Sequence, residues 1–359
     1  MSEQKENKIE EVFAIDLGNH QVKMKSSKSE IKNPSTYFNK ERLPKQLFGN
    51  PHAEGNKTYE ISNDDFSAFV WGKNLDFYHQ SEDLIDTFSR SFRYESKATQ
   101  RLLNFALARM GIDFKESQNS FLPTKVIMGL PITDLQEQKS TVEIIKNIVS
   151  GKHLVTVDGR ETMVEAARDN IYVVPQYMGT MIHLAMDEDG NYNDKFRNGK
   201  FGIGDLGGGT RMANIVAGLD PVGEGYEDLK GVDTLVRAIA GKEGISRLSD
   251  LKKTLRSGNK KDGYIYRPTN NEISNKIITQ TVIQEIKNFT SSVANFIRSN
   301  FKDIDEFDGI ILTGGGVNLL DRAILRTELG ESLYGMLIFV KDPEFANVRG
   351  YYKIAKFLV

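Results

Sequence analysis

The sequence predicts an α/β protein made of two similar lobes, and three observations lead to this prediction. The chain has 359 residues, more than one hydrophobic core usually supports, so two domains are expected. Apolar strand-like runs alternate with amphipathic helical patterns along most of the chain, which is typical of α/β lobes. Two apolar runs about half a chain apart, 12–15 and 201–204, each end in an Asp that is followed closely by Gly. The repeated ending suggests one such turn in each lobe.

The composition is that of an ordinary folded protein. Hydrophobic residues make up 39% of the chain and charged residues 27%, as in most globular domains. The formal net charge of −2 and the pI of about 6.3 exclude a general basic field for nucleic acid, so DNA contact would need a local patch or an adaptor protein. Cysteine is absent, which excludes disulfides and thiolate metal sites and fits a reducing cytosol.

The start of the chain carries no targeting signal. Residues 1–11 are polar and charged and lack the apolar segment of a signal peptide. No run approaches the ~18 apolar residues that span a membrane. We therefore expect a disordered tail at 1–11, a cytoplasmic protein and no membrane partner.

The first half of the chain is expected to begin with strands. Residues 12–25 read as a hairpin that turns at Gly18-Asn19. Between 33 and 63, prolines, glycines and asparagines predict exposed loops and short strands. The next elements expected are a helix from Ser96 to Gly111, a strand at 125–130 stopped by Pro131, a helix capped by Thr133 and Gln136 that runs to about 150, a hairpin turning at Asp158-Gly159, a strand at 171–174 and a helix beginning near Pro175-Gln176.

The second half is expected to repeat the strand-first order. The polar, glycine-bearing segment 187–200 reads as a hinge or lobe boundary, and a strand ending at Asp205 with a return strand at 212–218 follows it. The later elements expected are a helix at 231–240, a surface loop at 257–271, a helix at about 275–300 with an apolar face of Val282, Ile286, Phe289, Val293 and Phe296, a strand at 308–312 and a helix from about 347.

Asp16 and Asp205 are the most informative acids. Each closes an apolar strand beside a glycine turn, where a carboxylate faces Mg²⁺ directly or through water and glycine amides approach phosphate oxygens. Lys23 follows on the returning strand of the first hairpin, within reach of β- and γ-phosphates. Either Asp-Gly pair alone is equally typical of an ordinary turn. Both together, with Lys23 and a third glycine turn, favour a nucleotide site.

That third turn is Gly314-Gly315-Gly316, which follows a buried strand and suits close backbone approach to a base or ribose. No P-loop pattern exists in the chain. Gly202, Gly204 and Gly207 match the dinucleotide pattern in letters only, because the first two lie within the strand and another strand follows. The order of the three turns, two with Asp and then one with Gly alone, is what makes the pattern specific for a nucleotide site.

Gln176 and the histidines are less decisive. Gln176 follows a buried strand and starts a helix, a place from which Gln orients an attacking water in phosphoryl transfer. On its residues alone, the segment is more typical of an ordinary helix start. His20 lies within the first turn, where it contacts either nucleotide or solvent, and none of the five histidines has metal-ligand spacing.

These residues resemble the actin, heat-shock chaperone and sugar-kinase ATPase superfamily. The resembling segments are Asp16-Leu17-Gly18-Asn19 for the first phosphate motif, Pro175-Gln176-Tyr177-Met178-Gly179 for the first connecting helix, Asp205-Leu206-Gly207-Gly208-Gly209-Thr210 for the second phosphate motif, Leu312-Thr313-Gly314-Gly315-Gly316 for the adenosine motif and Asn347-Val348-Arg349-Gly350-Tyr351 for the second connecting helix. Within the superfamily the chain most resembles ParM-type plasmid-segregation bacterial actins of Gram-positive plasmids, from residue 12 to the C-terminus. Two places depart from the pattern: His20, where a small residue is more usual, and Arg211-Met212-Ala213-Asn214, in place of a Thr- and Asp-rich stretch.

The resemblance implies an actin-like two-lobe ATPase fold, with duplicated ribonuclease-H-like domains around a nucleotide cleft. Lobe I would hold 12–178 plus 346–359, and lobe II 179–345. The cofactors implied are ATP or GTP with Mg²⁺, the metal being held through water by Asp16 and Asp205. Asp205, Gln176 and Asp16 would be catalytic. The implied phosphate contacts are Gly18, Asn19, His20, Lys23, Gly207, Gly208, Gly209 and Thr210, and the implied adenosine or base contacts are Gly314, Gly315, Gly316 and Asn318.

The resemblance also implies a function. Identical subunits would assemble into a nucleotide-dependent filament that segregates plasmid DNA, and hydrolysis of ATP or GTP would control the polymer. A DNA-binding adaptor at a centromere-like plasmid site would be the second partner, with no direct nucleic-acid contact.

Other members of the superfamily offer alternatives. A small-molecule kinase, acting on a sugar or an acid, is the main one, although no base Asp for such a substrate is identified. A chaperone would need a substrate-binding domain after the ATPase lobes, and a shape-determining actin usually carries an amphipathic membrane segment that 1–11 does not supply.

Overall fold

A computed structural model describes residues 10–42, 54–62, 64, 68–75, 84–87, 93–137, 139–268 and 272–359. The chain divides into two compact units, Met1–Asn193 with Asn347–Val359, and Asp194–Ala346. The expected lobes ended at 178 and 345, whereas the helix that starts at Gln176 stays whole in the first unit. Most of the expected tail lies outside the described residues, and Glu11 already begins a strand.

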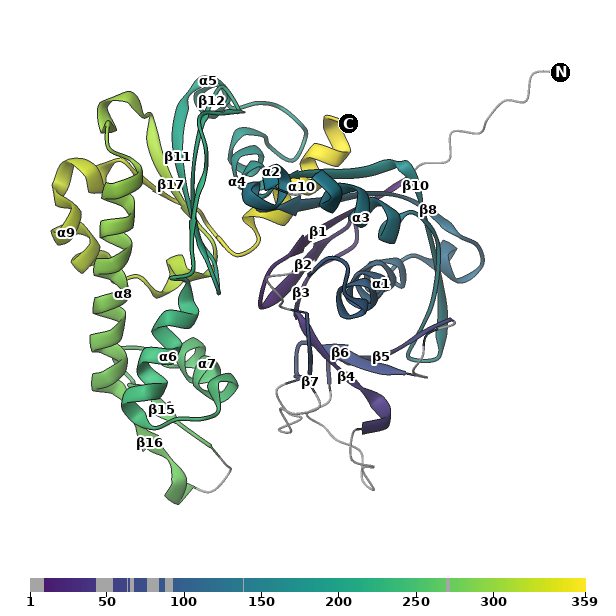
Figure 1. Cartoon of the computed structure of the whole chain (residues 1–359), viewed down its shortest axis with the longest axis horizontal. Helices are drawn as coiled ribbons and strands as arrows, with labels where there is room; N and C mark the ends of the chain where they lie inside the picture. The colour runs from purple at the N-terminus through teal and green to yellow at the C-terminus, as the bar shows by residue number, and fades with distance from the viewer. Residues whose placement is uncertain are drawn as a thin grey trace. The chain divides into compact units, whose positions relative to one another are not determined.

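The first unit contains one ten-stranded sheet (Figure 1). Its strands, in sheet order, are β3 (Glu30–Pro34), β2 (Gln21–Lys25), β1 (Glu11–Leu17), β8 (Leu122–Leu130), β10 (Arg160–Pro175), β9 (Gly151–Val157), β5 (Asn56–Ile61), β6 (Phe69–Gly72), β4 (Thr36–Asn39) and β7 (Leu84–Asp86). The central strands β1, β8 and β10 are parallel, whereas β1 and β2 form the expected antiparallel hairpin. Because parallel strands end at one edge of a sheet, the ends of β1 and β10 lie at the same edge.

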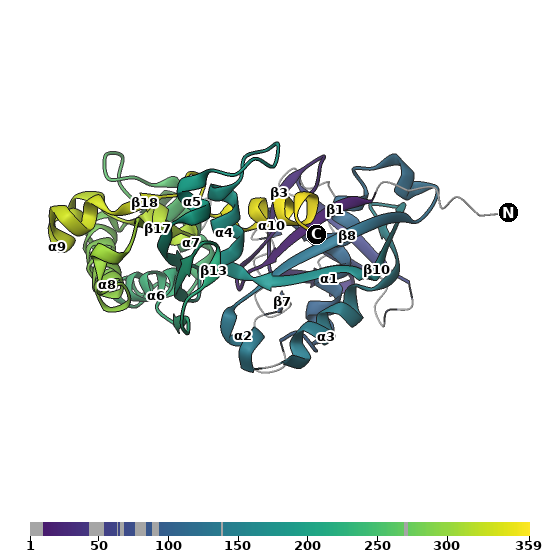
Figure 2. The same ribbon diagram turned by 90° about the horizontal axis from the view of Figure 1, so that it is seen from above.

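Helices cover both faces of this sheet. They are α1 (Lys97–Gly111), α2 (Ile132–Glu137), α3 (Lys139–Val149), α4 (Gln176–Ala185) and α10 (Ala346–Phe357), with short 3₁₀ turns η1 (Lys40–Arg42) and η5 (Lys115–Gln118). Successive side chains of a strand point to opposite faces. Val126 and Met128 of β8 therefore enter the core with Leu102 of α1, whereas Gly129 faces Tyr351 of α10. Figure 2 shows α10 lying along β1 and β8.

The core of the first unit is strongly aromatic. Tyr37, Tyr59, Phe69, Trp71 and Phe105 are fully buried, and their neighbouring ring centroids lie 4.8–6.0 Å apart. These rings come from β4, β5, β6 and α1. They fix the outer strands of the sheet on α1. The short strands expected between 33 and 63 are therefore present, but Tyr37 and Tyr59 on them are buried rather than exposed.

The second unit contains a smaller sheet. Its strands, in sheet order, are β13 (Asp220–Pro221), β12 (Arg211–Ala217), β11 (Lys200–Leu206), β17 (Gly309–Thr313) and β18 (Leu337–Phe339), with β14 (Tyr226–Asp228) also paired to β12. A separate ribbon joins β15 (Ile265–Tyr266) to β16 (Lys276–Ile277). The helices are α5 (Asp194–Asn198), α6 (Val232–Glu243), α7 (Leu248–Ser257), α8 (Thr279–Asn300) and α9 (Arg322–Gly335), with 3₁₀ turns η6 (Glu272–Ser274), η7 (Ile304–Glu306) and η8 (Gly315–Leu319).

Most expected elements are confirmed. Ser96 caps α1 by accepting a hydrogen bond from the Thr99 amide. Asp158 and Gly159 have φ of 50° and 79°, as a type I′ hairpin turn requires. The five residues of the expected apolar face of α8 are all buried.

Several expectations are wrong. The loop expected at 257–271 contains β15, and the boundary segment expected at 187–200 contains α5. The strand at 171–174 is not separate but belongs to β10, whose ladder shifts register between Ala166 and Ile171. Helix α8 begins at Thr279 rather than 275, because Lys276 and Ile277 pair in β16. Thr133 lies inside α2 rather than before it, since Ile132 begins the helix.

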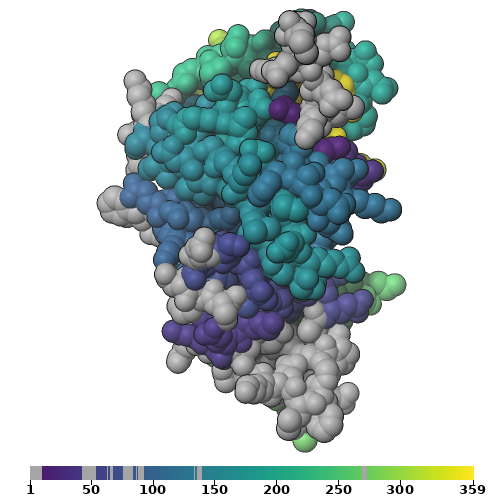
Figure 3. Space-filling model, turned by 90° about the vertical axis from the view of Figure 1, so that its right-hand side faces the viewer, coloured from purple at the N-terminus to yellow at the C-terminus, as the bar shows by residue number. Residues whose placement is uncertain are grey.

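Within the part of the chain that the structure describes, no helix combines the length and the apolar character that crossing a membrane requires. Figure 3 shows one face of the molecule, where blue and teal segments of the chain form much of the visible surface.

Candidate functional site

The first candidate site is the turn that joins β1 to β2. Asp16, at the end of β1, is 3% exposed and lies opposite Lys23 of β2 in the ladder. The Gly18 amide donates to the Gln21 carbonyl at 3.1 Å, which closes the turn. A Cβ on Gly18 would lie 2.8 Å from that carbonyl oxygen, so only glycine fits there.

The second turn, which joins β11 to β12, repeats this construction. Asp205 is also 3% exposed and lies opposite Met212, again seven residues later. The Gly207 amide donates to the Thr210 carbonyl at 2.9 Å. Both strands carry the return strand on one side and a parallel strand, β8 or β17, on the other. The two hairpins are therefore equivalent residue by residue, whereas the sequence suggested only one such turn in each lobe.

The carbonyls of the second turn are held by the start of α6. The amides of Val232, Asp233 and Gly231 donate to the carbonyls of Gly207, Gly208 and Gly209 at 3.1, 2.8 and 3.4 Å. In a trans peptide the C=O and the next N–H point in opposite directions. The N–H groups of Gly208, Gly209 and Thr210 therefore point away from α6.

The third turn packs directly on the second. Gly314 has a φ of 85° and follows Thr313, which lies opposite Asp205 in the β11–β17 ladder. A Cβ on Gly314 would lie 2.6 Å from the Leu206 carbonyl and would overlap the Asp205 carboxylate. The structure thus brings the second and third turns together in one unit. Asn318, in η8, is exposed near this turn.

The carbonyls of the first turn are held by side chains that the sequence analysis did not single out. Arg93 donates to the carbonyls of Leu17 and Gly18 and to the Asn19 side chain, at 2.9, 3.0 and 2.8 Å. Ser35 donates its hydroxyl to the Gly18 carbonyl at 2.6 Å and its amide to the His20 carbonyl at 2.9 Å. No local pattern marks either residue, because their acceptors lie far away in the sequence.

Lys23 lies over the first turn. Its Nζ is 3.2 Å from Asp16 Oδ2, and the Lys23 side chain is 16% exposed. The expected place beside the turn is therefore observed, and the ammonium contacts the carboxylate. In the second turn the equivalent residue is Met212, so only the first turn carries this cation.

Gln176 begins α4 directly after β10. It is half-buried, and its carbonyl accepts a hydrogen bond from the Tyr351 hydroxyl at 2.9 Å. Ile15 of β1 lies level with Met128 of β8, and Met128 with Val173 of β10. Asp16 and Gln176 thus lie at the same sheet edge with β8 between them, and two strand spacings correspond to about 10 Å.

Each turn offers one buried carboxylate for a metal ion. Among the described residues there is no group of three or more acidic, histidine or cysteine side chains that would hold an ion alone. Mg²⁺ usually keeps several waters and takes one or two carboxylates together with phosphate oxygens. Taken singly, each carboxylate suits a metal ion that is bound together with a nucleotide better than a metal ion held by protein alone.

Behind the second turn lies a buried ion pair. Arg211, 3% exposed, donates to Asp228 at 3.0 and 2.6 Å and to Ser292 of α8 at 3.0 Å. Burial raises the pKa of Asp228, but the hydrogen bonds and charge of Arg211 outweigh burial, and the pKa is lowered overall. This pair occupies the stretch where the sequence departs from the resembling pattern, and it anchors β12 to α8.

Comparison with known proteins agrees with this geometry. Residues 14–179 match the family described as "Actin like proteins N terminal domain". No curated protein matches the chain in sequence. Among solved structures, the chain is similar to apo pSK41 ParM (22% identity, TM-score 0.72, 96% of this chain and 97% of that chain). It is also similar to the actin-like protein Alp7A (16%, 0.75, 97% and 96%) and to a ParM in a 15-stranded filament from Clostridium botulinum (16%, 0.71, 97% and 99%).

The chain has an actin-like fold, and residues 14–179 match the actin-like N-terminal domain family. The predicted fold class is thereby confirmed. The roles of the individual turn residues stay predictions.

Proposed function

We propose that this protein is a nucleotide-dependent, filament-forming actin homologue that segregates plasmid DNA. The observation that carries the proposal is the pair of equivalent hairpins, each with a buried Asp at a strand end and a glycine turn closed by the same hydrogen bond. The proposal is further supported by the actin-like fold, which the chain shares over nearly its whole length with proteins named ParM, one of them in a filament.

We assign the binding of ATP or GTP with Mg²⁺ to three turns. The amides of the Gly18 and Gly207 turns and the ammonium of Lys23 would contact phosphate oxygens, because amides and ammonium groups are the donors that phosphates accept. Asp16 and Asp205 would hold water-bound Mg²⁺, which neutralises phosphate charge when bound. The Gly314 turn and Asn318 would contact the nucleoside.

Hydrolysis would rest on Asp205 and Gln176, which would orient and polarise the attacking water. A nucleotide favours whichever conformation binds it better, so binding and hydrolysis shift the population between assembling and non-assembling states. Head-to-tail contacts between identical subunits need not close into rings, and filaments can grow from them.

The plasmid link requires a partner. With a net charge of −2, the chain is poorly suited to bind DNA by a general field. We propose a cytoplasmic DNA-binding adaptor, at a centromere-like plasmid site, that captures the filament.

Light scattering and pelleting test the proposal. The purified chain is incubated with Mg²⁺ and ATP, GTP, their diphosphates or no nucleotide, beside an Asp205→Ala variant. We expect triphosphate-dependent assembly followed by decay, and we expect phosphate release and decay to slow at least tenfold in the variant, because loss of one transition-state contact typically costs 10²–10³ in rate.

A variant in the same sheet controls for misfolding. Ile215→Val removes one methyl group from β12 at a partly buried position, and it should assemble and decay as the wild type does. If the wild type never assembles with any triphosphate, the filament proposal fails. Phosphate transfer to a sugar or an acid without assembly would support the kinase alternative instead.

A further inference from the structure

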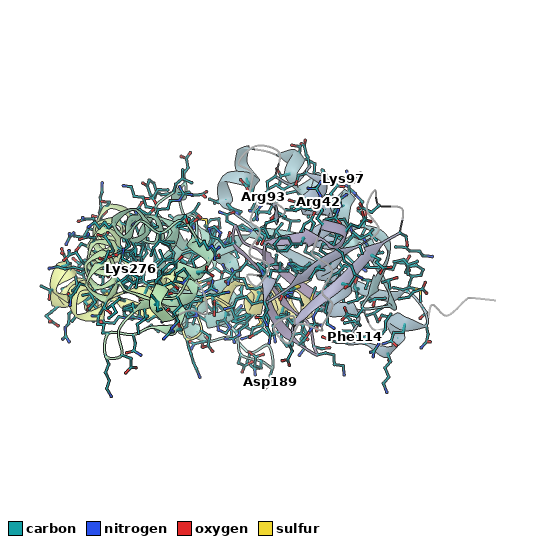
Figure 4. The ribbon with its side chains drawn as sticks, turned by 90° about the horizontal axis from the view of Figure 1, so that it is seen from below. Arg42, Arg93, Lys97, Phe114, Asp189 and Lys276 are labelled. Atoms are coloured by element: carbon teal, nitrogen blue, oxygen red, sulfur yellow. The ribbon has the colours of Figure 1, made fainter. Side chains whose placement is uncertain are left out.

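We propose that Arg93 is a positioning residue that holds the first turn in its phosphate-binding form and supplies a buried positive charge behind it. The inference rests on the proposed nucleotide site, which it deepens by naming a residue outside every motif of the sequence. Arg93 lies just before α1 in the first unit (Figure 4).

Arg93 contacts three oxygen acceptors of the first turn. One guanidinium nitrogen donates to two consecutive carbonyls, those of Leu17 and Gly18, while another donates to Asn19 Oδ1. A planar guanidinium with a fixed fork of donors can hold three acceptors of one turn together. Since the carbonyl of Gly18 points to Arg93, the next N–H, that of Asn19, points away from it.

The two equivalent turns differ in the groups that donate to their carbonyls. In the second turn, three amides at the start of α6 hold the carbonyls of Gly207, Gly208 and Gly209. The first turn has Arg93 and Ser35 in their place. The carbonyls of the two turns are thus held by different donors. In both turns the N–H groups point the opposite way, toward the proposed ligand.

Arg93 also brings a buried positive charge to the first turn. Arg93 is 9% exposed, and its contacts in the described part of the chain are carbonyl and amide oxygens and the ring of Tyr94, without a carboxylate. A buried guanidinium without an anionic partner is costly. A phosphate bound at the turn would provide the missing negative charge, so the cost of burying Arg93 becomes part of the affinity for nucleotide.

Arg93 is itself held in place. Its carbonyl accepts a hydrogen bond from the Ser96 hydroxyl at 2.9 Å, and Ser96 caps α1. The neighbouring Tyr94 donates its hydroxyl to Asp134 of α2 at 2.7 Å. The start of α1 therefore fixes the guanidinium under the turn.

A matched control is Arg101 of α1. It is equally buried, at 7% exposed, and it pairs with Asp64 through two hydrogen bonds of 2.9 and 2.6 Å. Its partners include Asp64, Tyr37 and the ring of Phe69, so its replacement reports the stability cost of losing a buried arginine.

The experiment compares the wild type with Arg93→Lys, Arg93→Gln and Arg101→Gln. Fluorescent ATP and GTP analogues with Mg²⁺ measure affinity at a temperature where circular dichroism shows each variant folded. Hydrogen exchange without nucleotide measures the amides of 17–22. We expect Arg93→Gln to weaken binding at least 30-fold, Arg93→Lys to weaken it about threefold to tenfold because it keeps the charge but loses the fork, and both to speed exchange in the turn.

Arg101→Gln should lower the melting temperature but leave the affinity and the turn exchange unchanged. The inference is overturned if Arg93→Gln binds nucleotide as the wild type does, or if Arg93→Gln and Arg101→Gln behave alike. A wild type that binds no nucleotide overturns the proposed function and this inference together. A wild type that binds nucleotide as well as Arg93→Gln does overturns this inference alone, so the two failures are distinguishable.

Discussion

Single residues decide how the sites are built. The Asp-Gly pairs of both hairpins were readable because the residues that form a turn are local, and Gly18 and Gly207 are required by a carbonyl only three residues away. Arg93 and Ser35 could not be found this way. Their acceptors lie up to 76 residues away, and only the fold brings them under the turn.

His183 of α4 gives a prediction of pH dependence. Burial, together with the positive charges of Lys353 and Arg349, lowers its pKa from 6.5 to about 4, while Glu188 and Glu30 oppose the shift. Between these values the unfolded chain binds a proton that the folded chain does not. Stability should therefore fall as the pH falls from about 6.5 to 4, by about 2 kcal/mol at pH 5.

Denaturant unfolding at pH 7 and pH 5 measures this effect. His183→Gln should remove about 2 kcal/mol from the difference between the two pH values, since the other titrating groups are common to both proteins. An equal pH dependence in wild type and variant would show that His183 is protonated as easily in the folded state as in the unfolded state.

At the scale of elements, α4 and α10 cross with their backbones in close contact. A Cβ on Gly350 would overlap the Gly179 carbonyl, and Thr180 donates its hydroxyl to Asn347 at 2.7 Å. Two glycines let the backbones touch, and Tyr351 fills the space over Gly129. The sequence placed both helices but gave no sign of their crossing, because packing depends on residues far apart in the chain.

Gly350→Ala should therefore destabilise the first unit by about 1–3 kcal/mol or more, because a well-packed contact cannot accept another carbon. Gly241→Ala in α6 is the matched control. No atom lies within 4 Å of its Cβ position, so the change should stabilise the helix by up to about 1 kcal/mol.

Thermal and denaturant unfolding of both variants check this prediction. If Gly350→Ala were as stable as Gly241→Ala, the two helices would have to separate at no cost, and the contact would not be tight.

The element boundaries that the sequence missed have a common cause. The outer strand β7, the ribbon of β15 and β16, and the continuity of β10 depend on partners from other segments. Hydrophobic periodicity finds elements that bury a face, such as α8, but it does not reveal a two-residue strand or a bulge.

At the scale of the whole molecule, the fold class followed from the order of three turns and the alternation of strands and helices. The match to an actin-like domain and the likeness to actin-like structures confirm it. The boundary between the two units was harder to predict. The residues of a helix that connects two units do not indicate to which unit the helix belongs.

The weak net charge gives a prediction for the intact protein. With a net charge of −2, the purified chain should not retard a plasmid DNA fragment at about 0.15 M salt, and retardation should require an adaptor. An electrophoretic shift with the chain alone, falling steeply as salt rises, would reveal a local basic patch and contradict the adaptor.

The first unit is discontinuous in sequence, because α10 returns to it after the segment Asp194–Ala346. During synthesis its large sheet must wait for the helix that supplies Tyr351, whose side chain is fully buried. At roughly 5–20 residues per second the ribosome needs about eight to thirty seconds to make the intervening unit. For that time the β8 surface around Gly129 is uncovered, so nascent chains of this protein should depend on chaperones more than the finished fold suggests.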